Sequence, residues 1–227
     1  MAAFRLLLLA AGLLLTAGAT HAQNTPDTTA ARPLSRHQFG VTIGFGVALV
    51  TPTEDYYLPN DGLKFGADAE LQYAYYFDHD RTMALRLGLR TLSRRGSYTF
   101  GARQVHRDEV FLAVPLELVM RRQWREHPNW FSTMAFGGYF SELTGRITYV
   151  LDPASGKTQH SEDDWLYGIG GFTGCYGVGH RSGHHYREFG VRFSTDAGGF
   201  TSSPGPNDLP NLRASNISLY YSLELGI

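Results

Sequence analysis

The sequence predicts an all-β protein, an eight-stranded antiparallel up-and-down transmembrane β-barrel, and three observations support this. The first is the last stretch of the chain, residues 216–227, where every second residue from Ile217 is apolar and the residues between are mostly small, polar or charged. A period of two is typical of a strand, and the length matches the ~9–11 residues of a tilted strand that crosses a bilayer. The others are seven similar stretches upstream and a strict alternation of long and short connections.

The start of the chain is typical of an exported protein. Arg5 precedes an apolar run over residues 6–15, and small residues then lead to Ala22 before Gln23. A basic start, a short apolar core and small residues before a cleavage point describe a secretory signal peptide, and the run is too short to span a bilayer as a helix. The expected division of the chain is a signal peptide at 1–22, a flexible periplasmic leader at 23–36 and an outer-membrane barrel at 37–227.

Composition excludes some classes of function. The net charge of -1 gives no reason to expect a nucleic-acid partner, and the single Cys175 allows no internal disulfide framework. The chain has 26 glycines, 13 tyrosines and 14 phenylalanines but only 18% charged residues. This balance is expected where one face of each strand meets lipid and the other a crowded interior.

Five upstream stretches have a clear apolar face, and they lie at about 38–50, 63–77, 82–92, 109–121 and 186–197. Leu87 in the third and Leu116 in the fourth belong to these faces, which should meet lipid. Pro115 lies inside the fourth and has no N–H for a ladder bond, so we expect a bulge or a missing bond there.

Two further stretches, at about 130–143 and 165–178, are rich in glycine, and their lipid-facing side stays open. The residues that can share a face are Trp130, Met134, Phe136 and Phe140 in one stretch and Trp165, Tyr167 and Ile169 in the other. Gly168, Gly170 and Gly174 superficially resemble a nucleotide-binding loop, but no strand-to-helix context follows them. We interpret them as small residues of a barrel wall.

The connections sort by length. Long connections are expected at 51–62, 93–108, 144–164 and 198–213, and short ones at 78–81, 122–129 and 179–185. Outer-membrane barrels have long extracellular loops and short periplasmic turns. This pattern therefore predicts that both termini are periplasmic.

The structural alternative is a secreted soluble barrel of lipocalin type, whose apolar face would point inward. Period two does not separate the two possibilities. The polar face has few charges, of both signs, and aromatic residues at strand ends fit interfacial girdles. These girdle candidates are Phe39, Phe77, Trp130 and Trp165. Both features favour the membrane barrel.

With the signal peptide, the eight alternating stretches and the ending Leu223-Glu224-Leu225-Gly226-Ile227, the chain resembles the small outer-membrane β-barrel proteins of Gram-negative bacteria, often called porin-family or outer-membrane β-barrel domain proteins. The resemblance covers residues 38–227. It implies an outer-membrane location, with the lipid bilayer and the barrel-assembly machinery as partners, although the signal read by that machinery commonly ends in Phe and this chain ends in Ile. It implies no fixed catalytic set.

The main candidate site is a set of charges on the expected interior face. The acids are Asp68, Glu70, Glu117, Glu188 and Glu224, and the bases are Lys64, Arg86, Arg90, Arg121 and Arg192. Asp68 and Glu70 belong to the second stretch. Arg86 and Arg90 belong to the third, its neighbour, so these two pairs are expected to face each other. Unpaired charges are costly in a narrow interior, and we interpret the set as a structural plug rather than an ion pathway.

Two other groups of residues are weaker candidates. His180, His184 and His185 have the side chains of a metal site, but no Cys or carboxylate is near them in sequence and a solvated turn explains them. The run 160–162 contains His, Ser and Glu, which suggests an esterase triad, but adjacent residues rarely converge on one reacting atom. We expect no catalytic, cofactor or metal site.

The sequence thus leaves three functions open. The first is a non-enzymatic outer-membrane barrel that acts in envelope integrity or surface interaction through four long extracellular loops. The alternatives are an accessory barrel of a secretion or transport assembly, with envelope partners, and an outer-membrane lipid-processing enzyme.

Overall fold

The computed structural model describes residues 36–52, 58–59, 63–78, 80–100, 103–152, 157–162, 168–199 and 212–226. The expected signal peptide at 1–22 and all but Arg36 of the expected leader lie outside these ranges. No helix within the described ranges is long and apolar enough to cross a membrane. The regular structure described consists of strands.

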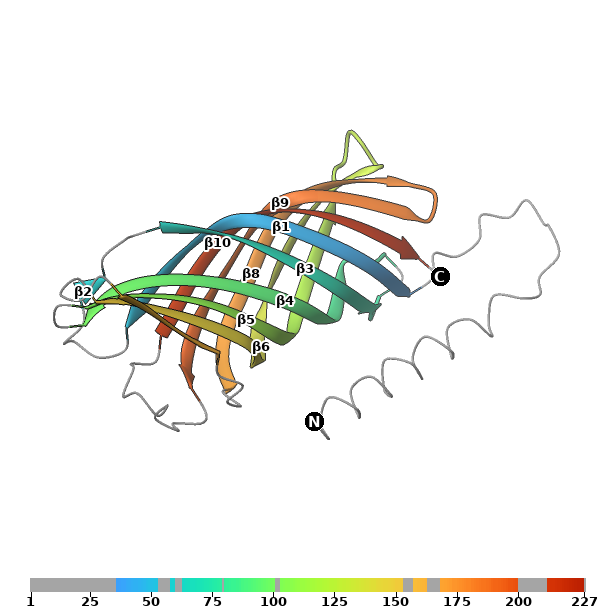
Figure 1. Cartoon of the computed structure of the whole chain (residues 1–227). Helices are drawn as coiled ribbons and strands as arrows, with labels where there is room; N and C mark the ends of the chain where they lie inside the picture. Colours follow the sequence, from blue (N-terminus) through green and yellow to red (C-terminus); the bar gives the residue numbers. More distant parts are fainter. Residues whose placement is uncertain are drawn as a thin grey trace.

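Eight long strands form the wall of a closed barrel (Figure 1). They are β1 (His37–Pro52), β3 (Leu63–Tyr76), β4 (Met83–Phe100), β5 (Arg103–Gln123), β6 (Trp130–Asp152), β8 (Gly168–Ser182), β9 (His185–Gly199) and β10 (Leu212–Gly226). Each pairs antiparallel with its neighbours along the chain, and β1 also pairs with β10, which closes the ring. Two short strands lie outside this ring: β2 (Leu58–Pro59) pairs with the end of β4, and β7 (Lys157–Glu162) pairs with the end of β6. The predicted fold class is confirmed.

The closing seam runs along the whole of β10. Its register with β1 extends from Gln38 opposite Gly226 to Pro52 opposite Leu212. The backbone N–H of Gly226 donates a hydrogen bond of 2.9 Å to the carbonyl oxygen of His184 in the β8–β9 turn. The end of β10 therefore lies at the end of the barrel where the short turns are, which we call the turn end; the opposite end is the loop end.

Several strands reach further toward the loop end than the sequence predicted. The expected loop at 93–108 is largely strand: β4 includes residues 93–100 and β5 includes residues 103–108. The first part of the expected loop at 144–164 is also strand, because β6 includes residues 144–152. The extensions of β4 and β5 carry polar residues such as Arg95 and Gln104 at their outward positions, so the apolar half of their alternation is lost. The extension of β6 keeps Ile147 and Tyr149 on its outward face, but a register shift at residue 144 changes the outward residues from even-numbered to odd-numbered. The expected loops 51–62 and 198–213 lie largely outside the described residues.

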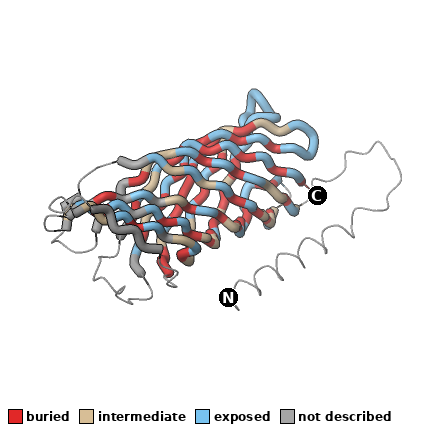
Figure 2. Tube along the Cα trace, viewed as in Figure 1, coloured by how far each residue is buried: buried red, intermediate tan, exposed pale blue. Residues whose placement is uncertain are grey.

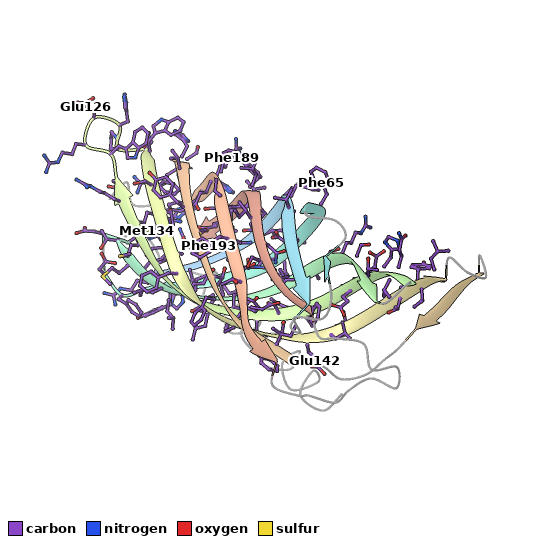
Figure 3. All side chains as sticks on the ribbon, turned by 90° about the vertical axis from the view of Figure 1, so that its left-hand side faces the viewer. Phe65, Glu126, Met134, Glu142, Phe189 and Phe193 are labelled. Carbon is purple, nitrogen blue, oxygen red and sulfur yellow. The ribbon has the colours of Figure 1, made fainter. Side chains whose placement is uncertain are left out.

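Exposed and buried positions alternate along the barrel strands (Figure 2), and most of the large apolar residues lie at exposed, outward positions (Figure 3). The side chains labelled in Figure 3 include Phe65, Met134, Phe189 and Phe193, which stand away from the ribbon. Leu87 and Leu116 face each other across β4 and β5 and are 41% and 49% exposed. A soluble lipocalin-type barrel requires the reverse arrangement, so that alternative is wrong.

The glycine-rich strands also have a defined outward face. On β6 the four candidates Trp130, Met134, Phe136 and Phe140 all face outward. On β8 the outward residues are Phe172 and Tyr176, whereas Ile169 is 1% exposed and packs inside the barrel. Odd-numbered residues of β8 such as Ile169 point inward. Trp165 and Tyr167, which were suggested to share a face with Ile169, lie outside the described residues, so the shared face stays a prediction.

Pro115 interrupts the ladder as expected. Pairing between β4 and β5 runs from Met83 to Leu87 and resumes at Arg90, so Gly88 and Leu89 have no partner in this register. A side chain at Gly88 would overlap the Glu70 carboxylate and the Pro115 ring. The gap in the ladder and the missing side chain together make room for a buried acid.

A charge on the outward belt should destabilise the barrel. We expect Leu87→Arg or Leu116→Arg to lower the free energy of unfolding in lipid by ~2–4 kcal/mol if the site lies near the bilayer midplane, because the guanidinium must enter hydrocarbon. Gln104→Arg, at an exposed position beyond the belt, is the matched control and should have little effect. Urea titrations of the folded fraction in vesicles measure both. Equal stability of Leu87→Arg and Gln104→Arg would invert the assignment of faces.

Candidate functional site

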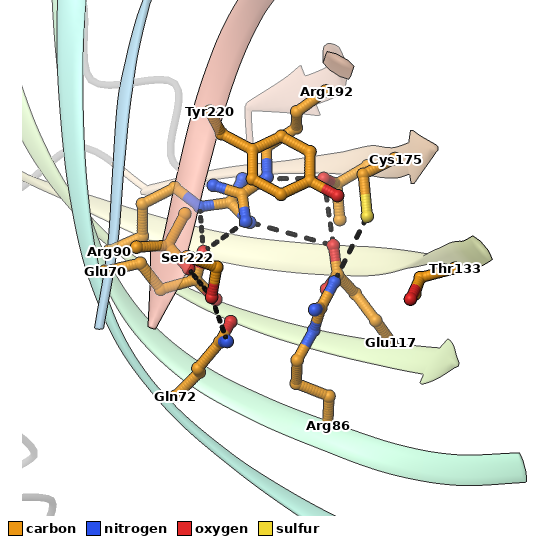
Figure 4. A network of polar contacts seen from close by, with 12 residues as sticks. Glu70, Gln72, Arg86, Arg90, Glu117, Thr133, Cys175, Arg192, Tyr220 and Ser222 are labelled. Atoms are coloured by element: carbon orange, nitrogen blue, oxygen red, sulfur yellow. Dashed lines mark hydrogen bonds and ion pairs between the residues drawn. The ribbon is translucent and has the colours of Figure 1, made fainter. Parts of the chain in front are cut away.

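The interior of the barrel holds a continuous chain of alternating charges (Figure 4). In order, its members are Asp68, Arg192, Glu70, Arg90, Glu117 and Arg86. Arg192 Nη1 lies 3.1 Å from Asp68 Oδ1, and Arg192 Nη2 lies 2.9 Å from Glu70 Oε2. Arg90 Nε donates to the same Glu70 oxygen at 2.9 Å. Three acids alternate with three bases, so the chain is electrically neutral.

In the second half of this series of charges, the Thr173 hydroxyl connects Arg90 to Glu117. Thr173 Oγ1 donates to Glu117 Oε1 at 3.2 Å and accepts a bond of 3.4 Å from Arg90 Nη1. Arg90 Nη2 lies 3.7 Å from Glu117 Oε1. Glu117 therefore receives hydrogen bonds from Arg86 and Thr173 and lies close to Arg90, so several donors stabilise this buried carboxylate.

Arg86 has a different partner from the one the sequence suggested. Its Nη2 lies 2.6 Å from Glu117 Oε2 and also donates to Cys175 Sγ at 3.3 Å. Arg86 stands directly opposite Glu117 in the β4–β5 register, whereas its neighbour on β3 is Ala74. The expected pairing of Arg86 with Asp68 or Glu70 is therefore wrong. Arg90, one of the two bases expected to face Glu70, does lie opposite it.

A second cluster lies nearer the turn end and is organised by Arg121. Its Nη2 lies 2.9 Å from Glu224 Oε2 and 3.8 Å from Glu188 Oε2. Glu188 also accepts hydrogen bonds from Thr133, at 2.7 Å, and from the Tyr220 hydroxyl. The Tyr220 ring lies 5.2 Å from the Arg192 guanidinium, so it links the two clusters.

Arg81 fills the interior at the turn end. It belongs to the β3–β4 turn, has a positive φ of 54°, and is only 3% exposed. Its guanidinium donates to the Tyr186 hydroxyl and lies over the Tyr76 and Tyr186 rings. The sequence analysis placed Arg81 in the short turn at 78–81, and no sequence pattern marks it as an interior residue.

With Arg81 included, the described interior charges of the two clusters balance. The acids are Asp68, Glu70, Glu117, Glu188 and Glu224, and the bases are Arg81, Arg86, Arg90, Arg121 and Arg192. That is five of each sign. Nine of the ten residues expected from the sequence thus have described interior positions, while the side chain of Lys64 lies outside the described residues.

The turn that carries Arg81 is held by Asp78. The Asp78 carboxylate accepts hydrogen bonds from the backbone N–H groups of Thr82, at 2.9 and 3.0 Å, and of Met83, at 3.1 Å. Slight burial acts to raise the pKa of Asp78, but these bonds and one from the Thr82 hydroxyl lower it overall. Asp78 therefore stabilises the turn in its ionised form.

At the loop end the two sides of the interior differ. One side is filled by an apolar cluster that consists of Leu92, Phe111, Ala113, Tyr139, Leu143 and Ile169. The other is lined by small residues such as Gly46, Ala48 and Gly66 and is hollowed by about 370 Å³ of space that includes open solvent. Asp68 and Arg192 line this hollow, so the charge chain begins where the hollow ends.

The two weaker candidates do not form sites among the described residues. His180 packs edge-on against Trp130, with ring centroids 5.3 Å apart, while His184 lies in the β8–β9 turn and His185 begins β9. No group of three possible metal ligands is present in the part of the chain that the structure describes. Residues 160–162 are consecutive in β7, where neighbours alternate between faces.

The geometry defines the class of protein. A closed antiparallel ring leaves no open sheet edge, and the outward apolar belt and the inward charges suit a surround of hydrocarbon. The chain is a transmembrane β-barrel of the kind found in bacterial outer membranes. This assignment rests on the ring, the belt and the charged interior.

The chain has distant similarities to solved structures. No family model matches the chain, and no curated protein matches it. Among solved structures, neisserial surface protein A is 12% identical, with 83% of this chain and 97% of that chain covered and a TM-score of 0.44. Ail, the attachment invasion locus protein of Yersinia pestis, is 9% identical, with 84% and 99% covered and a TM-score of 0.43. The outer membrane protein OprG of Pseudomonas aeruginosa is 9% identical, with 87% and 100% covered and a TM-score of 0.44.

Arg86 and Glu117 should be strongly coupled. Arg86→Met leaves Glu117 buried beside only the more distant Arg90, and we expect a loss of ~3–5 kcal/mol in the free energy of unfolding. Arg86→Met combined with Glu117→Gln should recover much of this loss, because no unpaired charge remains. Unfolding titrations of the two single variants and the double variant measure the coupling. Losses that simply add would show that the two side chains do not interact.

The Asp78 turn should give a pH-dependent contribution to stability. The pKa of Asp78 is lowered in the folded protein, so its stabilisation is complete above the ordinary aspartate range near ~3.9 and is lost as the pH falls through the folded value. We expect Asp78→Ala to be less stable than the wild type at pH 7 by roughly 1–2 kcal/mol. The difference should shrink at pH 3. A difference that stays constant between these pH values would contradict the role of the carboxylate.

Proposed function

We propose that this protein is a non-enzymatic outer-membrane barrel with a filled polar interior, which acts in envelope integrity or surface interaction through its extracellular end. The observation that supports this most is the bonded charge chain from Asp68 to Arg86. An eight-stranded barrel is only wide enough for side chains to fill. Since these side chains bind one another across that width, we assign them a structural role, and the exposed ends of the barrel remain for interaction.

The loop end is the better candidate for the interacting surface. Residues 93–100 of β4 lie beyond the apolar belt, and eight residues at about 3.3 Å each extend roughly 26 Å along the strand. They continue as a sheet with β5, β6 and β7. Stiff strands hold a surface at a fixed distance from the membrane, which suits contact with a partner outside the cell. We propose that this end is extracellular and both termini are periplasmic.

The proposed orientation has a direct test at the two ends of β4. In a Cys175→Ser background, Arg95→Cys should react with a membrane-impermeant thiol reagent on intact cells, because Arg95 is exposed beyond the belt (side chain 61% exposed). Asp80→Cys, exposed in the β3–β4 turn, should react only after the outer membrane is opened. Labelling of Asp80→Cys alone on intact cells would reverse the orientation.

The function itself is tested by removing the projecting hairpin. Replacement of residues 95–108 by Asn-Gly joins Arg94 to Glu109 through a two-residue hairpin turn and so keeps the pairing of these two residues in the β4–β5 register. Cells that lack the protein should lose both attachment to surfaces and resistance to deoxycholate if both roles hold. The shortened protein should restore detergent resistance but not attachment. Unchanged attachment and resistance in the deletion strain would contradict the proposal, and an altered lipopolysaccharide structure in that strain would favour the enzyme.

A further inference from the structure

One side of the barrel carries a basic and aromatic patch at the turn end. It consists of Arg122, Trp124, Trp130, His180 and Arg187, on or next to β5, β6, β8 and β9. Trp130 stands opposite His180, and His180 stands opposite Arg187. Neighbouring strands are about 4.8 Å apart, so three strand intervals separate Arg122 from Arg187 by roughly 14 Å around the wall.

The aromatic residues place this patch at a membrane–water boundary. The Trp124 and Trp130 rings stack with centroids 6.0 Å apart, and both side chains are more than 40% exposed. The backbone N–H of Trp124 donates a hydrogen bond of 3.0 Å to the backbone carbonyl oxygen of Trp130, which holds the two residues next to each other. Exposed tryptophans favour the level of lipid headgroups, because the ring is apolar and its N–H needs a polar partner.

The two arginines of the patch have no ion-pair partner among the described residues. Arg122 and Arg187 are exposed, and neither forms an ion pair with another described residue. Arg125 in the β5–β6 turn adds a further positive charge, and Glu126, labelled at this turn in Figure 3, is the one acid between residues 122 and 130. Across the barrel, the β3–β4 turn carries the acids Asp78 and Asp80 instead. The positive charge therefore gathers on one side of the rim.

We propose that this patch binds the headgroups of anionic phospholipids. Guanidinium groups bind phosphate oxygens through paired N–H donors, and the stacked indoles would lie between the two arginines at the depth of the glycerol and upper acyl chains. The proposal rests on the orientation proposed above, which places the turn end in the phospholipid leaflet that faces the periplasm. It gives the barrel a lipid-binding side that is separate from its loop end.

The test uses the full folded barrel and phosphatidylglycerol as the probe. The protein is reconstituted in vesicles of phosphatidylcholine with one quarter phosphatidylglycerol, extracted in mild detergent, and the lipid it retains is measured by native mass spectrometry. The wild type should retain phosphatidylglycerol in preference to phosphatidylcholine. Each arginine near an anionic surface should contribute roughly a fivefold preference, so Arg122→Gln combined with Arg187→Gln should lower the preference roughly 25-fold.

Arg95→Gln is the matched control, since it removes an exposed arginine at the opposite end and should leave retention unchanged. Arg187→Gln alone should show an intermediate loss, and the heat-dependent electrophoretic mobility of each variant reports whether it is folded. Equal retention by the wild type and the double variant would overturn the proposal. So would a fraction of phosphatidylglycerol among the retained lipids that is no higher than its fraction in the vesicles. Because retention is measured in detergent, this result does not depend on which end of the barrel faces outward.

Discussion

The pairing of buried carboxylates with guanidinium groups is the constraint on which the rest of the structure depends. An eight-stranded wall encloses little space, and charges in it are stable only when each has partners of opposite sign. Among the described residues, the two interior clusters together with Arg81 contain five acids and five bases, joined by ion pairs, hydroxyls and aromatic rings. Several features of the backbone follow from it. Gly88 leaves room for Glu70, and Gly177 leaves room for Glu188 and Tyr220, because a side chain at either position would overlap those groups.

The exterior obeys the opposite requirement. Outward residues such as Phe45, Leu219 and Phe193 are more than half exposed, which suits a surround of lipid rather than water. The belt ends where the outward residues of β4 change from Leu89 to Arg95, and the strands continue past it. Strand length therefore separates two parts of the molecule: a belt whose composition is set by the membrane, and a projecting sheet whose outward residues are free to serve other contacts.

The alternation of the strands was sufficient to predict the ring, its closing seam and most inward and outward faces. Even the defect at Pro115 followed from its missing N–H. The details that failed depend on tertiary register. Arg86 pairs with Glu117 because those two residues lie opposite each other in the β4–β5 register. The sequence alone does not show which residue of one strand lies opposite which residue of the next. Arg81 enters the interior from a turn whose conformation is fixed by Asp78, and the polar extensions beyond the belt resemble loops because one half of their pattern is gone.

The most direct test of the account is a spin-label scan along β10 in a bilayer. Single cysteines at Ile217, Leu219 and Leu223, whose side chains are at least half exposed, and at Ser218 and Ser222, which are buried, would carry a nitroxide in a Cys175→Ser background. Oxygen dissolves in hydrocarbon, so its collision rate with the label reports contact with lipid. The account expects high rates at 217, 219 and 223 and low rates at 218 and 222. High rates at 218 and 222 with low rates at the odd positions would show that the charged face meets the membrane, and would contradict a barrel built around buried ion pairs.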